Sequence, residues 1–254
     1  MSIPTIIKHS YQSNWLYQPA RSLYWRLLRP DRLAKLRQEV TFYSKLLEPH
    51  SLCFDLGANI GEKTEALLKA GMRVVAFEPQ PSCMRELEAR CSPYRSKLSK
   101  CPCAVGAESG VTKLYVHAHH GHSSLDRNWT VGEVVSSIDV PMTTLDRAIA
   151  KFGQPSYCKI DVEGWEYEVL KGLTHPIPLL SFEYHLQKDN IDKTLACIHY
   201  LSHLGKLSIN ITPAEKLLFT FEKWLSVKKF LELFPDSFCS QKEYGYGDIF
   251  VSIQ

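Results

Sequence analysis

The residues best suited to chemistry follow a short apolar run, in the segment 52–64, which has the sequence LCFDLGANIGEKT. Gly57 and Gly61 allow the backbone to turn sharply and to approach a ligand where a Cβ atom would collide. A helix that begins near Gly61 would present backbone N–H groups and a partial positive charge to a carboxylate or phosphate. Asp55 adds a carboxylate at the entrance of the turn. The segment therefore predicts a binding site for a ligand that carries charges of both signs.

A second acidic residue ends the next apolar run. Glu78 follows Gly57 by 21 residues (78 − 57), and at that spacing a carboxylate can accept both hydroxyls of a ribose. A dinucleotide favours G-x-G-x-x-G because its pyrophosphate sits against the turn, whereas this chain has D-x-G-x-x-x-G. S-adenosylmethionine carries a ribose, a carboxylate, an ammonium group and a sulfonium but no phosphate. The spacing therefore favours S-adenosylmethionine.

Two later apolar runs also end in ionisable residues. SYCKIDVEG ends with Asp161 and Glu163, and LLSFEYH ends with Glu183 and His185. Methyl transfer to an alcohol is helped by a base with a near-neutral pKa, which a histidine supplies. We expect His185, beside Glu183, to be this base, and Asp161 is the alternative that accepts the proton or orients the hydroxyl. A histidine that only bonds to a loop is the competing interpretation.

The segments that carry these residues alternate between strand-like and helix-like patterns from Ser51 onward. Such alternation predicts a mainly parallel sheet with helices on both faces. Because crossovers between parallel strands are right-handed, we expect an α/β fold with a Rossmann-like, doubly wound sheet. Ligands bind such sheets at the carboxyl ends of the strands, which is where the acids lie. We assign residues 49–254 to this domain.

Residues 1–48 form a predicted N-terminal helical extension. Its segment 21–37 carries six basic residues and one acid, Asp31, and Pro30 suits the first turn of a helix. One interpretation is a cover whose aromatic side chains pack on the main domain. The other is a lid over the substrate or a surface that meets an anionic lipid or polymer.

The composition bounds the class of protein. The chain has 254 residues and a formal net charge of +3, which fits one sizeable core and argues against a nucleic-acid partner. No apolar run reaches about 18 residues, so no transmembrane segment is expected, and the first residues do not resemble a signal peptide. The eight cysteines are scattered, and Cys53 and Cys158 lie inside apolar runs. We expect a cytoplasmic protein, with peripheral membrane contact left open.

Two clusters of potential metal ligands are not expected to bind a metal. Cys101 and Cys103 lie close together, but CPC has no second pair at zinc-site spacing. The histidines of the segment 117–122, HAHHGH, lack regular spacing and flanking acids. We expect them in a solvated or substrate-facing loop.

Six segments resemble those of the FkbM family of methyltransferases and occur in the same order: DLGANIGEKT, VVAFEPQP, AVGAESGVTKLYV, HSSL, TTLD and KIDVEGWEYEVLKG. The resemblance extends from about Ser51 to Leu186. It implies a seven-stranded α/β sheet of the class I methyltransferase type. It also implies a methyltransferase that uses S-adenosylmethionine and methylates a hydroxyl of a sugar, glycolipid or other natural-product scaffold. It also implies roles in binding the methionine half for Asp55, Gly57, Asn59 and Gly61, in binding the ribose for Glu78, beside the adenine for Ala104, and at the reacting centre for Asp161.

Three classes of function therefore remain. The first is an O-methyltransferase that acts on a small-molecule, glycan or glycolipid acceptor. The second is a non-catalytic or regulatory protein that binds an S-adenosyl ligand, which the intact acids at every strand end disfavour. The third, a nucleotide-dependent oxidoreductase, is disfavoured by the spacing of the glycines. The sequence indicates neither the acceptor nor the oligomeric state.

Overall fold

The computed structural model describes residues 30–129, 133–213, 216–235 and 245–254. The helices are α3 (Pro30–Leu46), α4 (Glu62–Lys69), α5 (Pro81–Arg90), α6 (Leu145–Phe152), α7 (Glu166–Lys171), α8 (Lys188–Ser202) and α9 (Val227–Leu233), with 3-10 turns η1 (Ser92–Lys97) and η2 (His120–His122). The strands are β1 (Leu52–Leu56), β2 (Arg73–Phe77), β3 (Leu98–Cys101), β4 (Ala104–Val105), β5 (Gly110–His117), β6 (Val134–Thr143), β7 (Tyr157–Ile160), β8 (Leu179–His185), β9 (Leu207–Pro213), β10 (Leu225–Ser226) and β11 (Tyr246–Ile253).

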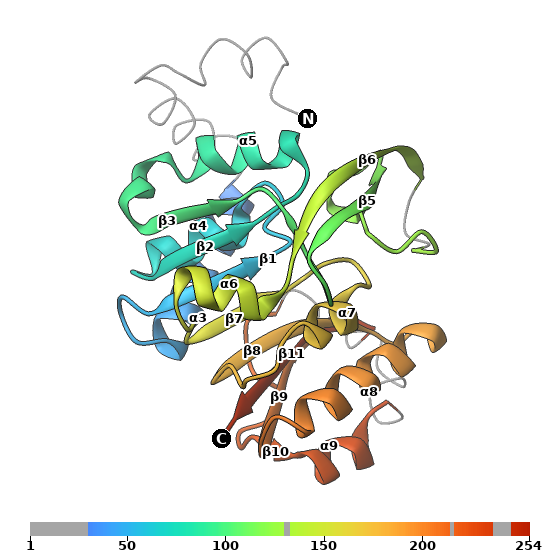
Figure 1. The fold of residues 1–254 in the computed structure, drawn as a ribbon. Coiled ribbons are helices and arrows are strands. Elements are labelled where there is room, and N and C mark those ends of the chain that lie inside the picture. The colour runs from blue at the N-terminus through green and yellow to red at the C-terminus, as the bar shows by residue number, and fades with distance from the viewer. Residues whose placement is uncertain (1–29, 130–132, 214–215, 236–244) are drawn as a thin grey trace.

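The large sheet has the strand order β10-β9-β11-β8-β7-β1-β2-β3 (Figure 1). Strands β3, β2, β1, β7 and β8 are parallel to one another, whereas β11 is antiparallel to both β8 and β9. From β1 the chain adds β2 and β3 on one side and later β7 and β8 on the other, so the carboxyl ends of β1 and β7 flank the point where the winding reverses. The predicted doubly wound sheet is confirmed. It gains a two-residue eighth strand, β10, at its edge.

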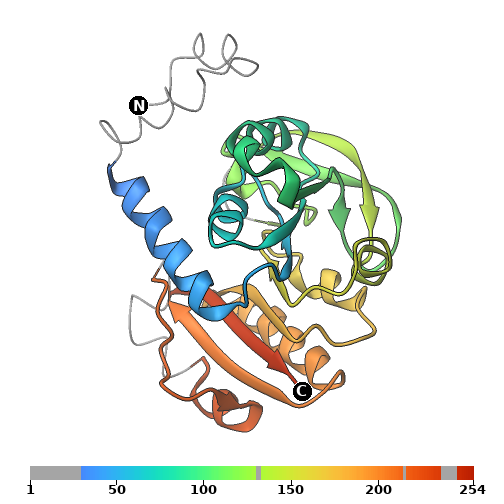
Figure 2. The same cartoon turned by 90° about the vertical axis from the view of Figure 1, so that its left-hand side faces the viewer.

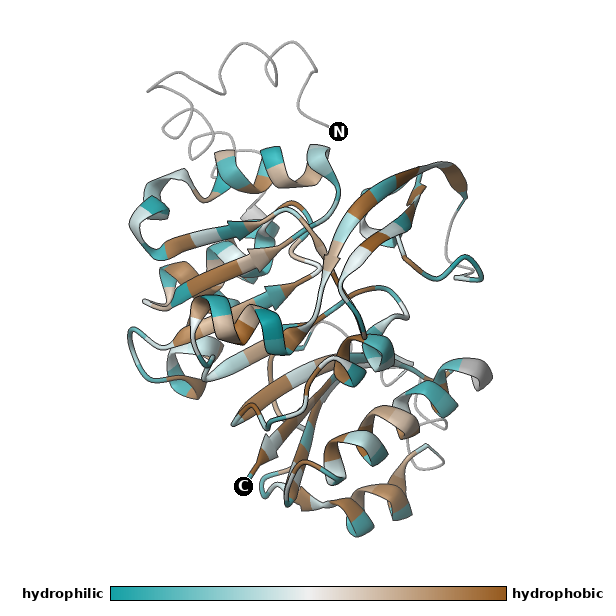
Figure 3. Cartoon of the chain, viewed as in Figure 1, coloured by the Kyte–Doolittle hydropathy of each residue, from teal (hydrophilic) through white to brown (hydrophobic). Residues whose placement is uncertain are grey.

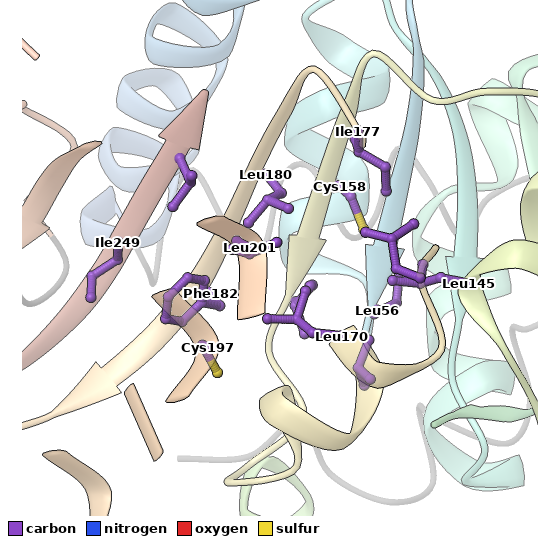
Figure 4. Close-up of a cluster of buried hydrophobic side chains, with 14 of the residues drawn as sticks. Leu56, Leu145, Cys158, Leu170, Ile177, Leu180, Phe182, Cys197, Leu201 and Ile249 are labelled. Atoms are coloured by element: carbon purple, nitrogen blue, oxygen red, sulfur yellow. The ribbon is translucent and has the colours of Figure 1, made fainter. Parts of the chain in front are cut away.

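Alternating side chains along the strands build two cores on opposite faces of this sheet. One face buries Phe54 and Leu56 of β1 with Cys158 of β7 and Phe182 of β8, and the helices α6, α7 and α8 cover it (Figure 4). The opposite face buries Cys53 and other residues beneath α3 and α4. Brown, apolar segments accordingly concentrate on the central strands, while the helices carry mixed colours (Figure 3).

Helix α3 packs on the second face along one side of the sheet (Figure 2). Phe42 and Tyr43 are buried, and the Phe42 ring lies 5.6 Å from the ring of Phe250 on β11. The buried Glu39 accepts a hydrogen bond of 2.7 Å from Lys63 of α4. The last turns of α3 are therefore part of the core beneath the sheet, as the interpretation of a packed cover requires. Residues 1–29 lie outside the described residues, and the separate domain 1–48 stays a prediction.

A small second sheet, of order β4-β6-β5, projects beside the large one (Figure 1). The segment GVTKLYVHA (residues 110–118) predicts one strand of a hairpin-like excursion. This strand is β5, and it pairs with β6 in an antiparallel hairpin. The apolar pattern of KCPCAVG (residues 100–106) predicts one continuous strand. This prediction is wrong, because β3 ends at Cys101 in the large sheet and β4 begins at Ala104 in the small one. Pro102 has no N–H to donate, and Cys103 donates its N–H back to the Cys101 carbonyl at 2.8 Å, so the strand breaks there. Strands β6 and β10 and helix α9 were not predicted.

Within the described ranges, every helix is too short or too polar to cross a membrane.

Candidate active site

The glycine turn after β1 is held by the loop after β7. Gly57 has a φ of +73°, and a Cβ atom there would lie 1.7 Å from the Asp161 carbonyl oxygen. The N–H groups of Gly57 and Ala58 both donate to the Phe77 carbonyl at 3.0 Å. The first glycine is therefore required by the approach of Asp161, whereas sequence reasoning had attributed it to a ligand. Because of this contact, the carboxyl ends of β1, β2 and β7 meet at one point.

Asp55 is buried beside this turn with one carboxylate oxygen satisfied. Its Oδ2 accepts a 2.6 Å hydrogen bond from the Thr64 hydroxyl of α4, whereas its Oδ1 is buried and has no hydrogen-bond partner among the described residues. Burial raises the pKa of Asp55, although the Lys159 ammonium opposes the shift. A buried acceptor without a donor is costly, and a cationic ligand group would remove that cost. Asp55 thus fits an ammonium group.

Glu78 follows β2 and faces the same turn. Its Oε2 accepts from the Asn59 N–H at 2.8 Å and its Oε1 accepts from the Gln80 N–H at 2.7 Å. Each carboxylate oxygen retains a further lone pair, so vicinal hydroxyls can still be bound. Burial raises the pKa of Glu78 to about 7, despite the two backbone hydrogen bonds that favour the charged form. Glu78 therefore changes charge close to neutral pH.

A pocket of about 340 Å³ joins these groups, a volume at the lower end of the range for small-molecule sites. Ala104 and Val105 of β4 line it together with Leu114 of β5, and they supply an apolar wall for a flat ring. The start of α4 has no side-chain cap, and Glu62 and Lys63 of its first turn line the same pocket. Five of the residues predicted to bind the cofactor line this pocket: Asp55, Gly57, Asn59, Glu78 and Ala104. Gly61, at the N-cap of α4, lies next to them.

The histidine segment forms part of the pocket wall. His119 and His120 line the pocket, and their rings stack with centroids 4.9 Å apart. The His120 Nδ1 atom lies 2.7 Å from the Asn59 Oδ1 atom, which ties the segment to the glycine turn. Asn59 has a φ of +48°, a conformation that asparagine tolerates better than most residues. The histidine segment thus faces the pocket, and a substrate-facing role for it stays a prediction.

Three carboxylates converge at the other end of the pocket. One oxygen of each of Asp161, Glu163 and Glu183 lies within 4.8 Å of the others, close enough to share a metal ion. The buried Lys159 ammonium pairs with Asp161 at 2.5 Å, as expected for a lysine that neutralises a nearby acid. Burial would raise the pKa of Asp161, but Lys159 outweighs it and the pKa is lowered. Burial and the two neighbouring acids raise the pKa of Glu163 to about 9. The absence of a metal stays a prediction.

His185 lies just beyond these acids. Its Nε2 atom is 3.1 Å from the Glu183 Oε2 atom, and both residues line a small neighbouring cavity with Trp129. Burial disfavours the imidazolium, but the Glu183 carboxylate outweighs that effect, so the pKa of His185 is raised. The three residues predicted to be catalytic, Asp161, Glu183 and His185, are thus brought to one edge of the sheet, although His185 does not line the main pocket.

One acid at this edge was missed by sequence reasoning. Asp248 lies on β11 directly opposite Glu183 of β8, and burial raises its pKa. Because β11 is antiparallel, the beginning of this strand, and not its end, meets the carboxyl edge of the sheet. A search restricted to strand ends cannot find such a residue.

The strand order and the pocket at the carboxyl edge define a Rossmann-like fold of the class I methyltransferase type. Residues 55–216 match the methyltransferase FkbM domain, and the chain belongs to this family. It is 30% identical over 200 residues to the hexuronic acid methyltransferase AglP of Haloferax volcanii, covering 73% of this chain and 76% of that protein.

Two solved methyltransferase structures are among those similar in fold. The precorrin-6y C5,15-methyltransferase of Geobacter metallireducens is 9% identical, with a TM-score of 0.43 and coverage of 88% of this chain and 86% of the other. A TehB-like SAM-dependent methyltransferase of Corynebacterium glutamicum is 10% identical, with a TM-score of 0.43 and coverage of 93% and 100%.

Proposed function

We propose that the protein transfers a methyl group from S-adenosylmethionine to a hydroxyl oxygen of a sugar, either free or within a glycan or glycolipid. The observation that carries the proposal is the single pocket that joins the unpartnered Asp55 oxygen, the Glu78 carboxylate and the acids around Asp161. The name of the hexuronic acid methyltransferase relative supports a sugar acceptor.

The residues of the pocket fit the parts of S-adenosylmethionine. Asp55 would hold the ammonium group, Glu78 the ribose hydroxyls, and the start of α4 the methionine carboxylate. Ala104 and the apolar residues beside it would contact the adenine. When bound, the cofactor supplies a methyl group on a sulfonium, which an oxygen displaces in line.

The acceptor hydroxyl must lose its proton as the new C–O bond forms. Asp161 is a weak base because Lys159 lowers its pKa, whereas the raised pKa of His185 leaves it a stronger base. We therefore assign proton removal to His185. We assign to Glu183 the orientation of the His185 ring. Asp161, closer to the pocket, would accept a hydrogen bond from the acceptor and position it. A neutral Glu163 can donate a hydrogen bond there, since its pKa is about 9.

The test is an assay with isotopically labelled S-adenosylmethionine and a panel of neutral sugars, amino sugars and uronic acids, with the product identified by NMR. His185→Ala should lower the turnover number about 10²–10⁴-fold, as expected for loss of a general base, and leave the affinity for S-adenosylhomocysteine unchanged. His199→Ala, on the exposed side of α8, is the matched control. Binding of S-adenosylhomocysteine without methylation of any acceptor would favour the non-catalytic alternative. A protein that neither binds S-adenosylhomocysteine nor methylates any acceptor would refute the proposal.

A further inference from the structure

A pair of cysteines directly precedes the apolar wall of the pocket in the chain. The Sγ atoms of Cys101 and Cys103 are 3.1 Å apart, with only Pro102 between the two residues in the chain. Cys101 is half-buried and reachable from solvent, whereas Cys103 is buried. The other five cysteines among the described residues are all buried. The pair thus combines one accessible sulfur with a second sulfur at contact distance.

The two thiols differ in acidity. The hydrogen bond from Cys103 lowers the pKa of Cys101 to about 7 against the opposing effect of burial, and the Lys151 ammonium assists. The pKa of Cys103 is raised by the same contact and by burial. Burial raises the pKa of Cys53 and of Cys83 to about 12. Cys101 is therefore the group that attacks, since the thiolate is the nucleophile in exchange reactions.

The backbone around this pair is continuous with the ligand pocket. The Glu78 N–H donates to the Cys101 carbonyl at 3.2 Å, and Cys101 pairs with Phe77 of β2 in the parallel ladder. Ala104, the residue after Cys103, lines the pocket. A covalent bond between the two sulfurs would therefore change the backbone that supports both the ribose-binding carboxylate and the apolar wall.

We propose that Cys101 and Cys103 form a thiol–disulfide exchange site that reacts with small disulfides of the glutathione class and weakens binding in the adjacent pocket when oxidised. The Cys101 thiolate attacks one sulfur of glutathione disulfide, breaks its S–S bond and releases one glutathione thiolate. Cys103 then loses its proton to solvent and attacks the Cys101 sulfur of the mixed disulfide, which releases the second glutathione. The two protein thiols are oxidised to one disulfide and the glutathione disulfide is reduced to two thiols.

A disulfide across a single intervening residue closes a small ring, and strained disulfides are readily reduced by thiols. The oxidised form is therefore reversible and compatible with a compartment that keeps the other cysteines reduced. The exchange chemistry is independent of the proposed function. The effect of the disulfide on cofactor binding rests on the proposed function.

The test uses the full chain equilibrated in buffers of reduced and oxidised glutathione. Intact mass spectrometry should show the loss of two hydrogens, peptide mapping should place the bond between Cys101 and Cys103, and dithiothreitol should reverse it. Calorimetry should show binding of S-adenosylhomocysteine to the oxidised form weakened at least about tenfold, as for loss of one good polar contact, and restored on reduction. Cys101→Ser should abolish both effects, and Cys197→Ser, at a buried cysteine on α8, should change neither.

Several results would overturn the proposal. One is a mass unchanged in glutathione disulfide, and another is a glutathione adduct that persists on Cys101 without closing the ring. A third is a Cys101–Cys103 disulfide that leaves the affinity unchanged. If the reduced wild-type chain does not bind S-adenosylhomocysteine at all, the proposed function fails with the effect on binding, while the mass measurement still decides the exchange chemistry. The wild-type measurements stand even if a serine variant fails to fold.

Discussion

Replacing Glu78 by glutamine separates the charge of this residue from its shape. Both carboxylate oxygens accept backbone N–H groups, at 2.8 Å and 2.7 Å, and the residue lines the pocket. A glutamine fills the same space but has one acceptor atom, so one backbone N–H loses its partner and the hydroxyls of a bound ribose face a weaker site. Glu78→Gln therefore tests whether this carboxylate binds the ligand or only holds the turn.

The loss of affinity follows from the hydrogen bonds at stake. A hydrogen bond to a charged group contributes about 1.5–3 kcal/mol, which corresponds to a dissociation constant raised about 10- to 150-fold. The pKa of about 7 adds a dependence on pH. If the ligand binds only the ionised carboxylate, Glu78 must lose its proton on binding whenever the pH is below about 7. The affinity of the wild type should therefore fall by up to about tenfold for each pH unit below about 7. The glutamine variant should lack this contribution.

The ligand-free variant should not be correspondingly unstable. The pKa of Glu78 is raised on folding from 4.5 to about 7, so its contribution to stability is fully present below the lower value and is lost as the pH rises through the higher one. This loss is complete above about pH 7, where it amounts to about 3 kcal/mol of the free energy of unfolding. Glutamine avoids it, which offsets the roughly 1–3 kcal/mol cost of one unsatisfied backbone N–H.

Calorimetry with S-adenosylhomocysteine between about pH 6 and pH 8, which brackets the pKa of Glu78, measures the affinity and its pH dependence. Urea unfolding measures the free energy of unfolding. Glu88→Gln, at an exposed ion pair on α5, is the control and should change neither quantity. A Glu78→Gln protein that binds within twofold of the wild type, with the same pH dependence, would refute the assignment of Glu78.

Three further outcomes are expected. Glu183→Gln removes the charge that raises the pKa of His185, so the acid limb of the turnover profile should move to lower pH, and an unmoved limb would exclude His185 as the base. Gly57→Ala should abolish cofactor binding or folding, because its Cβ would meet a carbonyl oxygen, whereas Gly71→Ala has open space and should cost about 1–2 kcal/mol in urea unfolding; equal costs would contradict the contact. Lys159→Met should destabilise the protein by about 3–5 kcal/mol. Lys113→Met, in the exposed pair with Asp139 between β5 and β6, should leave the free energy of unfolding nearly unchanged; equal losses in the two variants would show that burial does not matter.

The part of the site built by neighbouring segments could be predicted from the sequence. Asp55, the glycine turn and Glu78 lie on β1, α4 and β2, so their spacing along the chain alone specifies their arrangement in a parallel unit. His120 contacts Asn59 across 61 residues, and Asp248 reaches the site through an antiparallel register. Neither contact leaves a local pattern, because each depends on how distant elements pack.

The fold was predictable to a similar extent. Helices α4, α5 and α6 and the central strands follow from periodicity and caps. The break between β3 and β4 depends on a small sheet that forms only when the β5–β6 hairpin is in place, which a local apolar pattern cannot convey.

The position of β11 has a consequence for how the chain folds during synthesis. This strand follows the other seven strands of the large sheet in the sequence, yet it lies between β8 and β9. Domains generally fold as units during synthesis, so the large sheet cannot be completed before β11 has been made, and β8 and β9 lack their shared neighbour until then. During that interval β8 and β9 each present an unpaired edge, which can pair with another chain or be bound by a chaperone.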